Sequence, residues 1–448
     1  MRRRTALASA GGLLASGVAG CLSLVSSGSE NSKDNPPLTE DSIPAGTWPQ
    51  IGYDAGHTRH IPQARGPRDD ATVAWEQPCD QSIHPPVVAD DLYLADIVES
   101  RTGDSTARAF APDDGAEQWA NTGLPSVGWA PALHGGRLFL ITRAERNIVR
   151  LHALDAATGD HEWVQNDGIT ASSGENQPIA PTVHDDSIHI GSDRGIVACD
   201  VTTGDIKWTA TLGPDIAEAE TGEKWATTWA KPAVASGCAF TFDRNDNHGE
   251  TREVYAVNAR SGEREWTAEL AVGDDWALRG PVVAGADHIF VSALKLVAVD
   301  TGGDDSSWSG KERLFALDIT SGEIAWDWEL PDTTMDPPAY ADGTLYVGGW
   351  DPDTDTGRLD ALDASDGSII WTYETEIGGI SAPTVAGDTV YIRQGTELTA
   401  VARDDKTRRW RLELGDYAGP PVVVGETVYT QMNPARDQES RLIAVREP

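Results

Sequence analysis

An eleven-residue pattern recurs along the chain and restricts what the chain can fold into. It reads Ala-x-Asp-x-x-Thr-Gly-x-x-x-Trp in the copy at 153–163, and most neighbouring copies begin about 45 residues apart. Missing such a repeat misassigns the whole fold, so it is analysed before any local feature. Looser copies end at Trp119 and Trp410, and the latter lacks both the Asp and the Gly. The clear copies occupy 153–163, 198–208, 256–266, 316–326 and 361–371.

One copy predicts part of a small antiparallel sheet. An alternating apolar run such as 196–199 is typical of a half-buried strand. The Asp and Thr then cap a turn whose Gly adopts positive φ without steric cost. A second strand carries the Trp, whose flat side chain fills the gap between stacked sheets. A Pro-x-apolar strand and a Gly/Asp turn precede each copy, as in 181–190, so one unit has four strands. Four-stranded units at this spacing are typical of propeller blades.

The blade count follows from the repeats and the two ends of the chain. After Trp410, three apolar runs near 421–424, 427–430 and 442–445 predict three strands. The missing fourth strand is available in Thr72–Trp75, and sharing it would leave no open sheet edge. We therefore predict an all-β fold, an eight-bladed propeller closed by its N- and C-terminal strands, with seven blades as the alternative. The docking tryptophans are Trp75, Trp119, Trp163, Trp208, Trp266, Trp326, Trp371 and Trp410.

The first 21 residues have the composition of an export signal. Arg2, Arg3 and Arg4 precede a mildly apolar stretch at 6–19 that is too short for a membrane span. The paired arginines resemble a twin-arginine signal, and Val18-Ala-Gly-Cys21 resembles a lipobox whose Cys21 is lipidated. The alternative is an ordinary signal peptide with an incidental cysteine. We predict a signal at 1–21, a disordered tether at 22–46 and a propeller at 47–448, anchored to the extracytoplasmic face of the cell membrane.

The formal net charge of −36 restricts the class of partner. Phosphate binding requires a basic surface, so nucleic acid is disfavoured. The acidic residues are scattered through predicted turns, which indicates a solvated surface. Such an acidic excess resembles that of proteins from extreme halophiles, in which salt screens self-repulsion.

The repeats resemble those of the PQQ-like β-propeller family, which includes the quinoprotein alcohol dehydrogenases and the lipoprotein BamB. The segment from Trp48 to Arg59 also resembles the lead-in of these proteins. The resemblance implies a non-catalytic scaffold or assembly factor that binds a protein partner at the membrane surface, with no catalytic residues and no cofactor. The alternative it implies is a PQQ-dependent dehydrogenase with Ca²⁺, although the chain lacks the adjacent Cys-Cys pair of those enzymes.

The loops entering the innermost strands would meet at one mouth of the ring. Aromatic faces beside cations suit an anionic or peptide ligand, or the aromatics plug the channel. A carbohydrate or cell-surface binding module is the third function considered, and it would depend on Trp129 or Trp229. The candidate binding residues are His84, Trp129, Trp229, Lys231, Arg279, Asp336 and Tyr417.

Two predicted hairpins carry alternate oxygen-bearing side chains. That spacing suits a hard cation such as Ca²⁺, but the Gly stands at position seven and no Glu stands at position twelve, so no metal is expected. His57, His60 and His84 are spread over separate loops, lack a ligand spacing and are interpreted as surface or turn histidines. Cys199 and Cys238 either pair or pack as small apolar residues. The weak metal candidates are Asp243, Asn245, Asn247, Asp351, Asp353 and Asp355.

Overall fold

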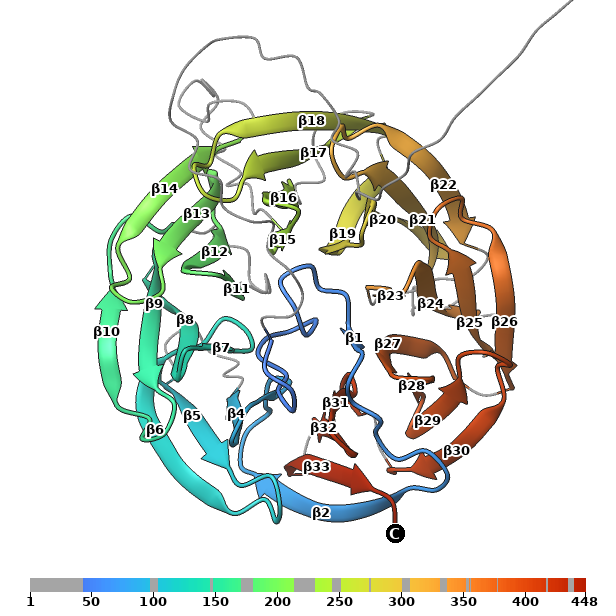
Figure 1. Cartoon of the computed structure of the whole chain (residues 1–448), viewed down its shortest axis with the longest axis horizontal. Coiled ribbons are helices and arrows are strands. Elements are labelled where there is room, and N and C mark those ends of the chain that lie inside the picture. The colour runs from blue at the N-terminus through green and yellow to red at the C-terminus, as the bar shows by residue number, and fades with distance from the viewer. Residues whose placement is uncertain are drawn as a thin grey trace, which may run out of the picture. The chain divides into compact units, whose positions relative to one another are not determined.

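The described chain forms eight antiparallel sheets around a common axis (Figure 1). The all-β, eight-bladed prediction is confirmed, and the alternative of seven blades is wrong. These residues belong to one compact unit, Leu38–Pro448. The computed structural model describes residues 43–96, 104–145, 148–170, 180–212, 230–243, 251–273, 275–299, 307–330, 337–351, 354, 356–376, 378–415, 418–433 and 439–448.

Blades are numbered in chain order, and each runs from an innermost to an outermost strand. Blade 1 contains β3 (Val87–Val88), β4 (Leu92–Ala95), β5 (Asp104–Phe110) and β6 (Glu117–Pro125). Blade 2 contains β7 (Ala132–His134), β8 (Arg137–Glu145), β9 (Ile148–Asp155) and β10 (His161–Gln165). Blade 3 contains β11 (Thr182–His184), β12 (Ser187–Gly191), β13 (Gly195–Asp200) and β14 (Ile206–Thr211). Blade 4 contains β15 (Ala233–Ala235), β16 (Cys238–Phe242), β17 (Thr251–Asn258) and β18 (Arg264–Ala271).

The second half of the ring repeats this order. Blade 5 contains β19 (Trp276–Ala284), β20 (His288–Val299), β21 (Ser307–Asp318) and β22 (Ile324–Leu330). Blade 6 contains β23 (Ala339–Ala341), β24 (Thr344–Asp351), β25 (Thr356–Asp363) and β26 (Ile369–Thr375). Blade 7 contains β27 (Ile380–Ala386), β28 (Thr389–Gln394), β29 (Glu397–Ala402) and β30 (Arg408–Glu413), with β1 (His60–Ile61) beside β27. Blade 8 contains β31 (Val422–Val424), β32 (Thr427–Met432), β33 (Ser440–Arg446) and β2 (Thr72–Cys79).

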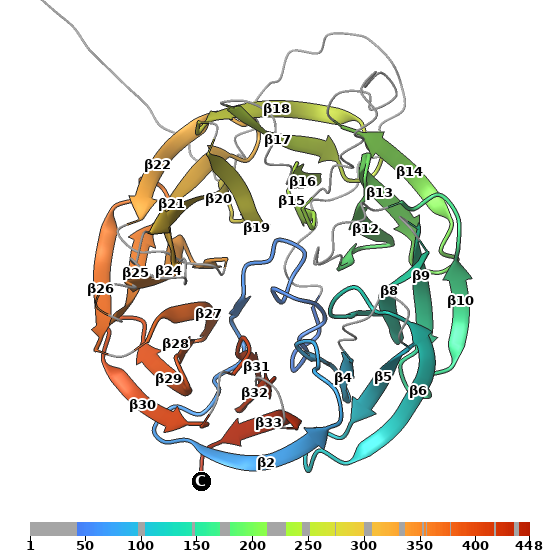
Figure 2. The ribbon, with the colours of Figure 1, turned by 180° about the vertical axis from the view of Figure 1, so that it is seen from behind.

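The two ends of the propeller share blade 8, as predicted. β2 pairs antiparallel with β33, and the register sets Trp75 opposite Ala444. Figure 2 shows β2 lying beside β33 at the closing point of the ring. An antiparallel strand from one end of the chain therefore completes the sheet built by the other end, which closes the ring without covalent linkage.

Six of the eight docking tryptophans contact the next blade at a glycine. A Cβ added at Gly159 would lie 2.5 Å from Cε3 of Trp119, and the φ of Gly159 is +75°. The indole N–H of Trp119 also donates a hydrogen bond to the carbonyl of Ala156 at 2.9 Å. The pattern thus requires Gly at this position, because the indole lies against the Cα and leaves no room for a Cβ. The same close approach occurs at Gly115, Gly204, Gly262, Gly322 and Gly367.

The copy that lost its glycine still makes the turn. Lys406 stands in that position and has a φ of +56°, and the Trp371 indole donates to the carbonyl of Arg403 at 2.9 Å. The final indole, that of Trp410, donates to the carbonyl of Pro67 at 2.7 Å. The segment before β2 therefore replaces the missing turn of blade 8.

We expect Gly159→Ala to destabilise the fold more than Gly136→Ala. Both glycines have the same left-handed backbone, with φ of +75° and +76°, but a Cβ at Gly136 meets no atom within 4 Å. Backbone strain is therefore matched, and the difference measures the clash with Trp119, about 1–3 kcal/mol for overpacking. Denaturant unfolding of both variants gives this difference. Equal free energies of unfolding would contradict the docking role of the glycine.

Candidate functional site

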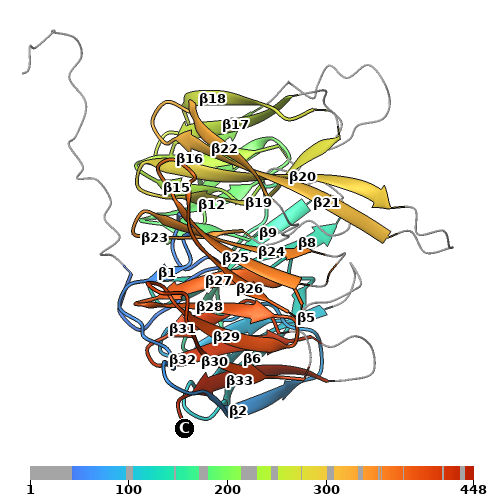
Figure 3. The same ribbon diagram turned by 90° about the vertical axis from the view of Figure 1, so that its right-hand side faces the viewer.

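The two faces of the ring are built from different parts of each blade. The first hairpin and the pattern turn of every blade lie at one end of its antiparallel strands, here called the turn face. The loops that enter the innermost strands lie at the other end, here called the loop face. Figure 3 shows the ring from the side, with β1 toward the turn face and the β20–β21 hairpin projecting from the loop face.

The loop face brings together two of the predicted binding residues. The rings of His84 and Trp129, from blades 1 and 2, have centroids 5.2 Å apart. His84 is buried, which corrects its interpretation as a surface histidine, while Trp129 is half-buried. Burial lowers the pKa of His84 to about 4, against a weaker opposing effect of the Val127 backbone. His84 is therefore neutral at physiological pH and supports the Trp129 ring.

The predicted cations of the mouth lie on blades 4 and 5. The Lys231 ammonium donates to the carbonyl of Ile51 at 3.1 Å, and burial lowers its pKa to about 7. Arg279 lies on β19 opposite Ser292 and is half-buried. The remaining mouth candidates, Trp229, Asp336 and Tyr417, lie outside the described residues.

Residues 48–66, here called the lead-in, run around the inside of the ring at the turn face (Figure 1). They hydrogen-bond to the innermost strand or first hairpin of every blade, in chain order. The blade residues that make these bonds are Val88, Leu133, Val183, Val234, Ala284, Tyr340, Val385 and Gly425. The lead-in thereby joins all eight blades from within.

The lead-in buries two residues that the sequence placed at the surface. His57 is 1% exposed, and its Nδ1 lies 2.9 Å from the Val282 carbonyl. Burial lowers its pKa well below 6.5, and Lys231 lowers it further. His60 is also largely buried, with its Nε2 3.8 Å from Asp342. The surface interpretation of both histidines is wrong because no local pattern marks a segment that fills a channel.

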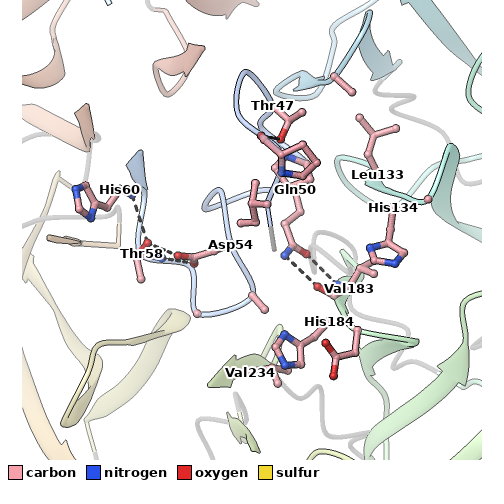
Figure 4. A pocket seen from close by; sticks show the side chains of 18 of the residues that line it. Thr47, Gln50, Asp54, Thr58, His60, Leu133, His134, Val183, His184 and Val234 are labelled. Atoms are coloured by element: carbon pink, nitrogen blue, oxygen red, sulfur yellow. Dashed lines mark hydrogen bonds between the residues drawn. The ribbon is translucent and has the colours of Figure 1, made fainter. Parts of the chain in front are cut away.

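The lead-in and the turns of blades 1 to 6 enclose a cavity of about 1040 Å³. Figure 4 shows the Gln50 side chain bonded to Val183 and the Asp54 carboxylate directed toward Thr58, both on the lead-in side of the cavity. Aliphatic side chains and two tyrosines form part of the wall. The carboxylates that line the cavity are Asp54, Asp90, Asp91, Asp155, Asp185 and Asp342.

The cavity is electronegative. Among the described residues, its lining includes neither Lys nor Arg. Three histidines line it, and burial is the largest cause lowering the pKa of each: to about 4 for His60, and below 6.5 for His134 and His184. Neutral histidines add no positive charge to this lining, and the cations that pair with it lie outside the wall: Arg403 at 3.1 Å from Asp342 and Arg260 at 4.0 Å from Asp185. In the sequence these Asp residues are scattered through separate turns. They line one cavity only after six blades have come together.

The described residues do not fit PQQ with Ca²⁺. Within the described ranges, no three His, Cys, Asp or Glu side chains are grouped to hold a metal ion. Lys231, the cation expected to face the quinone carboxylates, is bonded to the lead-in instead. Of the weak metal candidates, only Asp243 and Asp351 are described, and Asp351 accepts a hydrogen bond from Thr354. Cys199 and Cys238 are free thiols.

The family model described as outer membrane protein assembly factor BamB matches residues 121–327 and 310–446, more than half of the chain. The chain is 26% identical over 274 residues to the serine/threonine-protein kinase AfsK of Streptomyces griseus, spanning 55% of this chain and only 30% of that kinase.

Two solved structures share the fold. The quinohemoprotein alcohol dehydrogenase of Comamonas testosteroni superposes with a TM-score of 0.64 at 17% identity, covering 90% of this chain and 80% of the enzyme. BamB from Moraxella catarrhalis gives 0.56 at 16% identity, covering 84% of this chain and 100% of BamB. At these identities, the likeness shows the fold alone. In the part of the chain that the structure describes, no helix has the length and apolarity needed to cross a membrane.

Proposed function

The chain belongs to the family described as outer membrane protein assembly factor BamB, and from that membership we propose that it is a non-catalytic propeller that binds a protein partner. It is held at the outer face of the cell membrane by a lipid on Cys21, through the tether at 22–46. Loops and turns on a rigid scaffold commonly carry binding sites, and this propeller presents them on both faces.

The observation that carries this proposal is the charge of the turn-face cavity. Six carboxylates line a space of about 1040 Å³, and neither Lys nor Arg stands among the described lining residues. Complementary charge across an interface favours the correct partner and speeds its association. The partner therefore presents a Lys- or Arg-rich segment, whose aliphatic stems pack on apolar wall residues such as Leu133 and Val234.

A peptide-binding measurement tests the proposal. The mature chain should bind a Lys-rich peptide and not a Glu-rich peptide of equal length. The double variant Asp90→Asn, Asp185→Asn should weaken binding about tenfold, because each lost carboxylate removes attraction for the cationic peptide. The control is Asp205→Asn, which removes an exposed turn carboxylate outside the cavity. Equal loss in both variants, or none in either, would reject the cavity as the binding site.

The second candidate function is a quinone-dependent oxidoreductase, favoured by the fold shared with quinohemoprotein alcohol dehydrogenase. The test is reconstitution of the purified chain with PQQ and Ca²⁺. A bound-quinone spectrum with dye reduction by alcohols would establish this function in place of the scaffold. Membrane attachment is tested separately: Cys21→Ser should move the protein from the membrane fraction to the soluble fraction.

A further inference from the structure

Blade 3 lies between the two seams at which, in the described part of the chain, the docking indole makes no hydrogen bond. Among the described residues, the buried indole N–H groups of Trp163 and Trp208, on its two flanking seams, have no acceptor. Elsewhere the indole N–H donates across the seam, as from Trp326 to the carbonyl of Ala364 at 3.0 Å. A buried donor without a partner weakens an interface, because it loses its bond to water and gains none in return.

The seam between blades 3 and 4 shows what replaces one of these bonds. By position in the pattern, the carbonyl of Ala259 is the acceptor expected for Trp208, just as that of Ala156 is for Trp119. Instead, Nε2 of His189 lies 3.2 Å from the Ala259 carbonyl. The imidazole belongs to blade 3 and stands beside the indole, with ring centroids 5.7 Å apart. A neutral imidazole thus takes the place of the indole bond at this seam.

The lead-in also holds blade 3 differently. In blades 2, 4 and 5 the innermost strand donates to a backbone carbonyl of the lead-in, as from Val234 to Ala55 at 2.7 Å. In blade 3, the backbone N–H of Val183 donates to Oε1 of the Gln50 side chain at 2.9 Å. Nε2 of Gln50 in turn donates to the Val183 carbonyl at 3.2 Å. A side-chain amide must be held in one rotamer to make these bonds, so the contact is released more easily than a backbone bond.

We propose that blade 3 is the hinged sector of the ring, separating from blades 2 and 4 before any other pair of blades separates. Proteins open locally where the contacts are weakest, and such openings precede global unfolding. Three features meet at this one blade: a docking indole without an acceptor among the described residues on each flanking seam, an imidazole that bonds to Ala259 where the Trp208 indole is expected, and a side-chain contact from Gln50 to its innermost strand. The hinge does not depend on whether the turn-face cavity binds a partner.

Hydrogen exchange of the full chain tests the hinge. Amides of the central strands β12 and β13 should exchange about tenfold faster than those of β24 and β25, the matching strands of blade 6, because local opening sets their protection. Protection in blade 3 equal to or greater than that in blade 6 would overturn the proposal.

A tryptophan series provides the matched variants. Trp119→Phe and Trp326→Phe each remove an indole bond, and exchange beside each seam should rise about fivefold, the equivalent of a typical net hydrogen bond. Trp163→Phe and Trp208→Phe lose the same ring packing but remove no hydrogen bond, so exchange beside their seams should rise about fivefold less than in the first pair. An equal increase in all four variants would show that these seams do not differ, and would overturn the proposal.

Discussion

A variant whose propeller begins at Pro62 is expected to melt roughly 10 °C below one that begins at Ile43, given the usual relation between unfolding free energy and melting temperature. The shorter variant lacks most of the lead-in, so innermost strands around the ring lose their acceptors. Each lost bond costs about 1 kcal/mol net. Loss of the buried Trp48 and Ile61 side chains removes about 2–3 kcal/mol more for each.

Thermal unfolding followed by circular dichroism measures this difference. The variant beginning at Ile43 is the matched control, since it also lacks the signal and nearly all of the tether. A shorter variant that does not fold at all is the stronger form of the expected result. Equal melting temperatures would mean that the ring is held by its seams alone and that the lead-in is not structural.

Acid is expected to destabilise the propeller between pH 6.5 and pH 4, above the range in which most carboxylates titrate. His84, His152 and His189 are 2%, 4% and 1% exposed, and burial is the main cause that lowers the pKa of each to about 4. In the unfolded chain each titrates near 6.5 and so binds its proton first. Stability is therefore full above pH 6.5 and lost as pH falls toward 4, at about 3 kcal/mol for each histidine.

Denaturant unfolding at a series of pH values and fixed salt tests this expectation. Replacing all three histidines with Gln should reduce the dependence of the unfolding free energy on pH in that window, while His57 and His60, whose pKa values burial also lowers, retain part of it. A free energy of unfolding that stays constant from pH 7 to pH 4.5 in the unmodified protein would contradict the prediction.

The ring could be predicted from sequence because its determinants are local. A glycine four residues before a tryptophan specifies both the turn and the docking contact, as Gly159 and Trp119 of successive blades demonstrate. Closure could also be predicted, because the strand at Thr72–Cys79 has no other sheet to join. Because the pattern repeats, each copy supports the strand assignment made for its neighbouring copies.

The path of the lead-in could not be predicted. Tyr53, His57 and Arg59 adopt positive φ without being glycine, a conformation that costs energy and persists only where surrounding contacts impose it. Those contacts come from residues more than a hundred positions away, such as Thr182 and Val282 beside His57. The burial of the histidines and the composition of the cavity wall depend on that path, so the sequence could not predict them either.

The predicted mouth was placed only in part. Position before a proline places His84 ahead of β3 and Lys231 ahead of β15 but Arg279 within β19, and it gives no information on the direction of each side chain. Lys231 is bonded to Ile51 of the lead-in, and His84 lies buried beside Trp129. The direction of a side chain depends on what occupies the central channel. In this protein the lead-in occupies it.

The order in which the lead-in meets the blades bears on how the molecule is made. The lead-in precedes every blade in the chain, yet Arg65 and Gly66 donate to the carbonyl of Gly425 in blade 8. That contact can form only after the other blades have been synthesised. The pairing of β2 with β33 waits for the same final stretch. A chain without residues 425–446 can therefore form neither contact, so the lead-in and β2 lack these partners until blade 8 is complete.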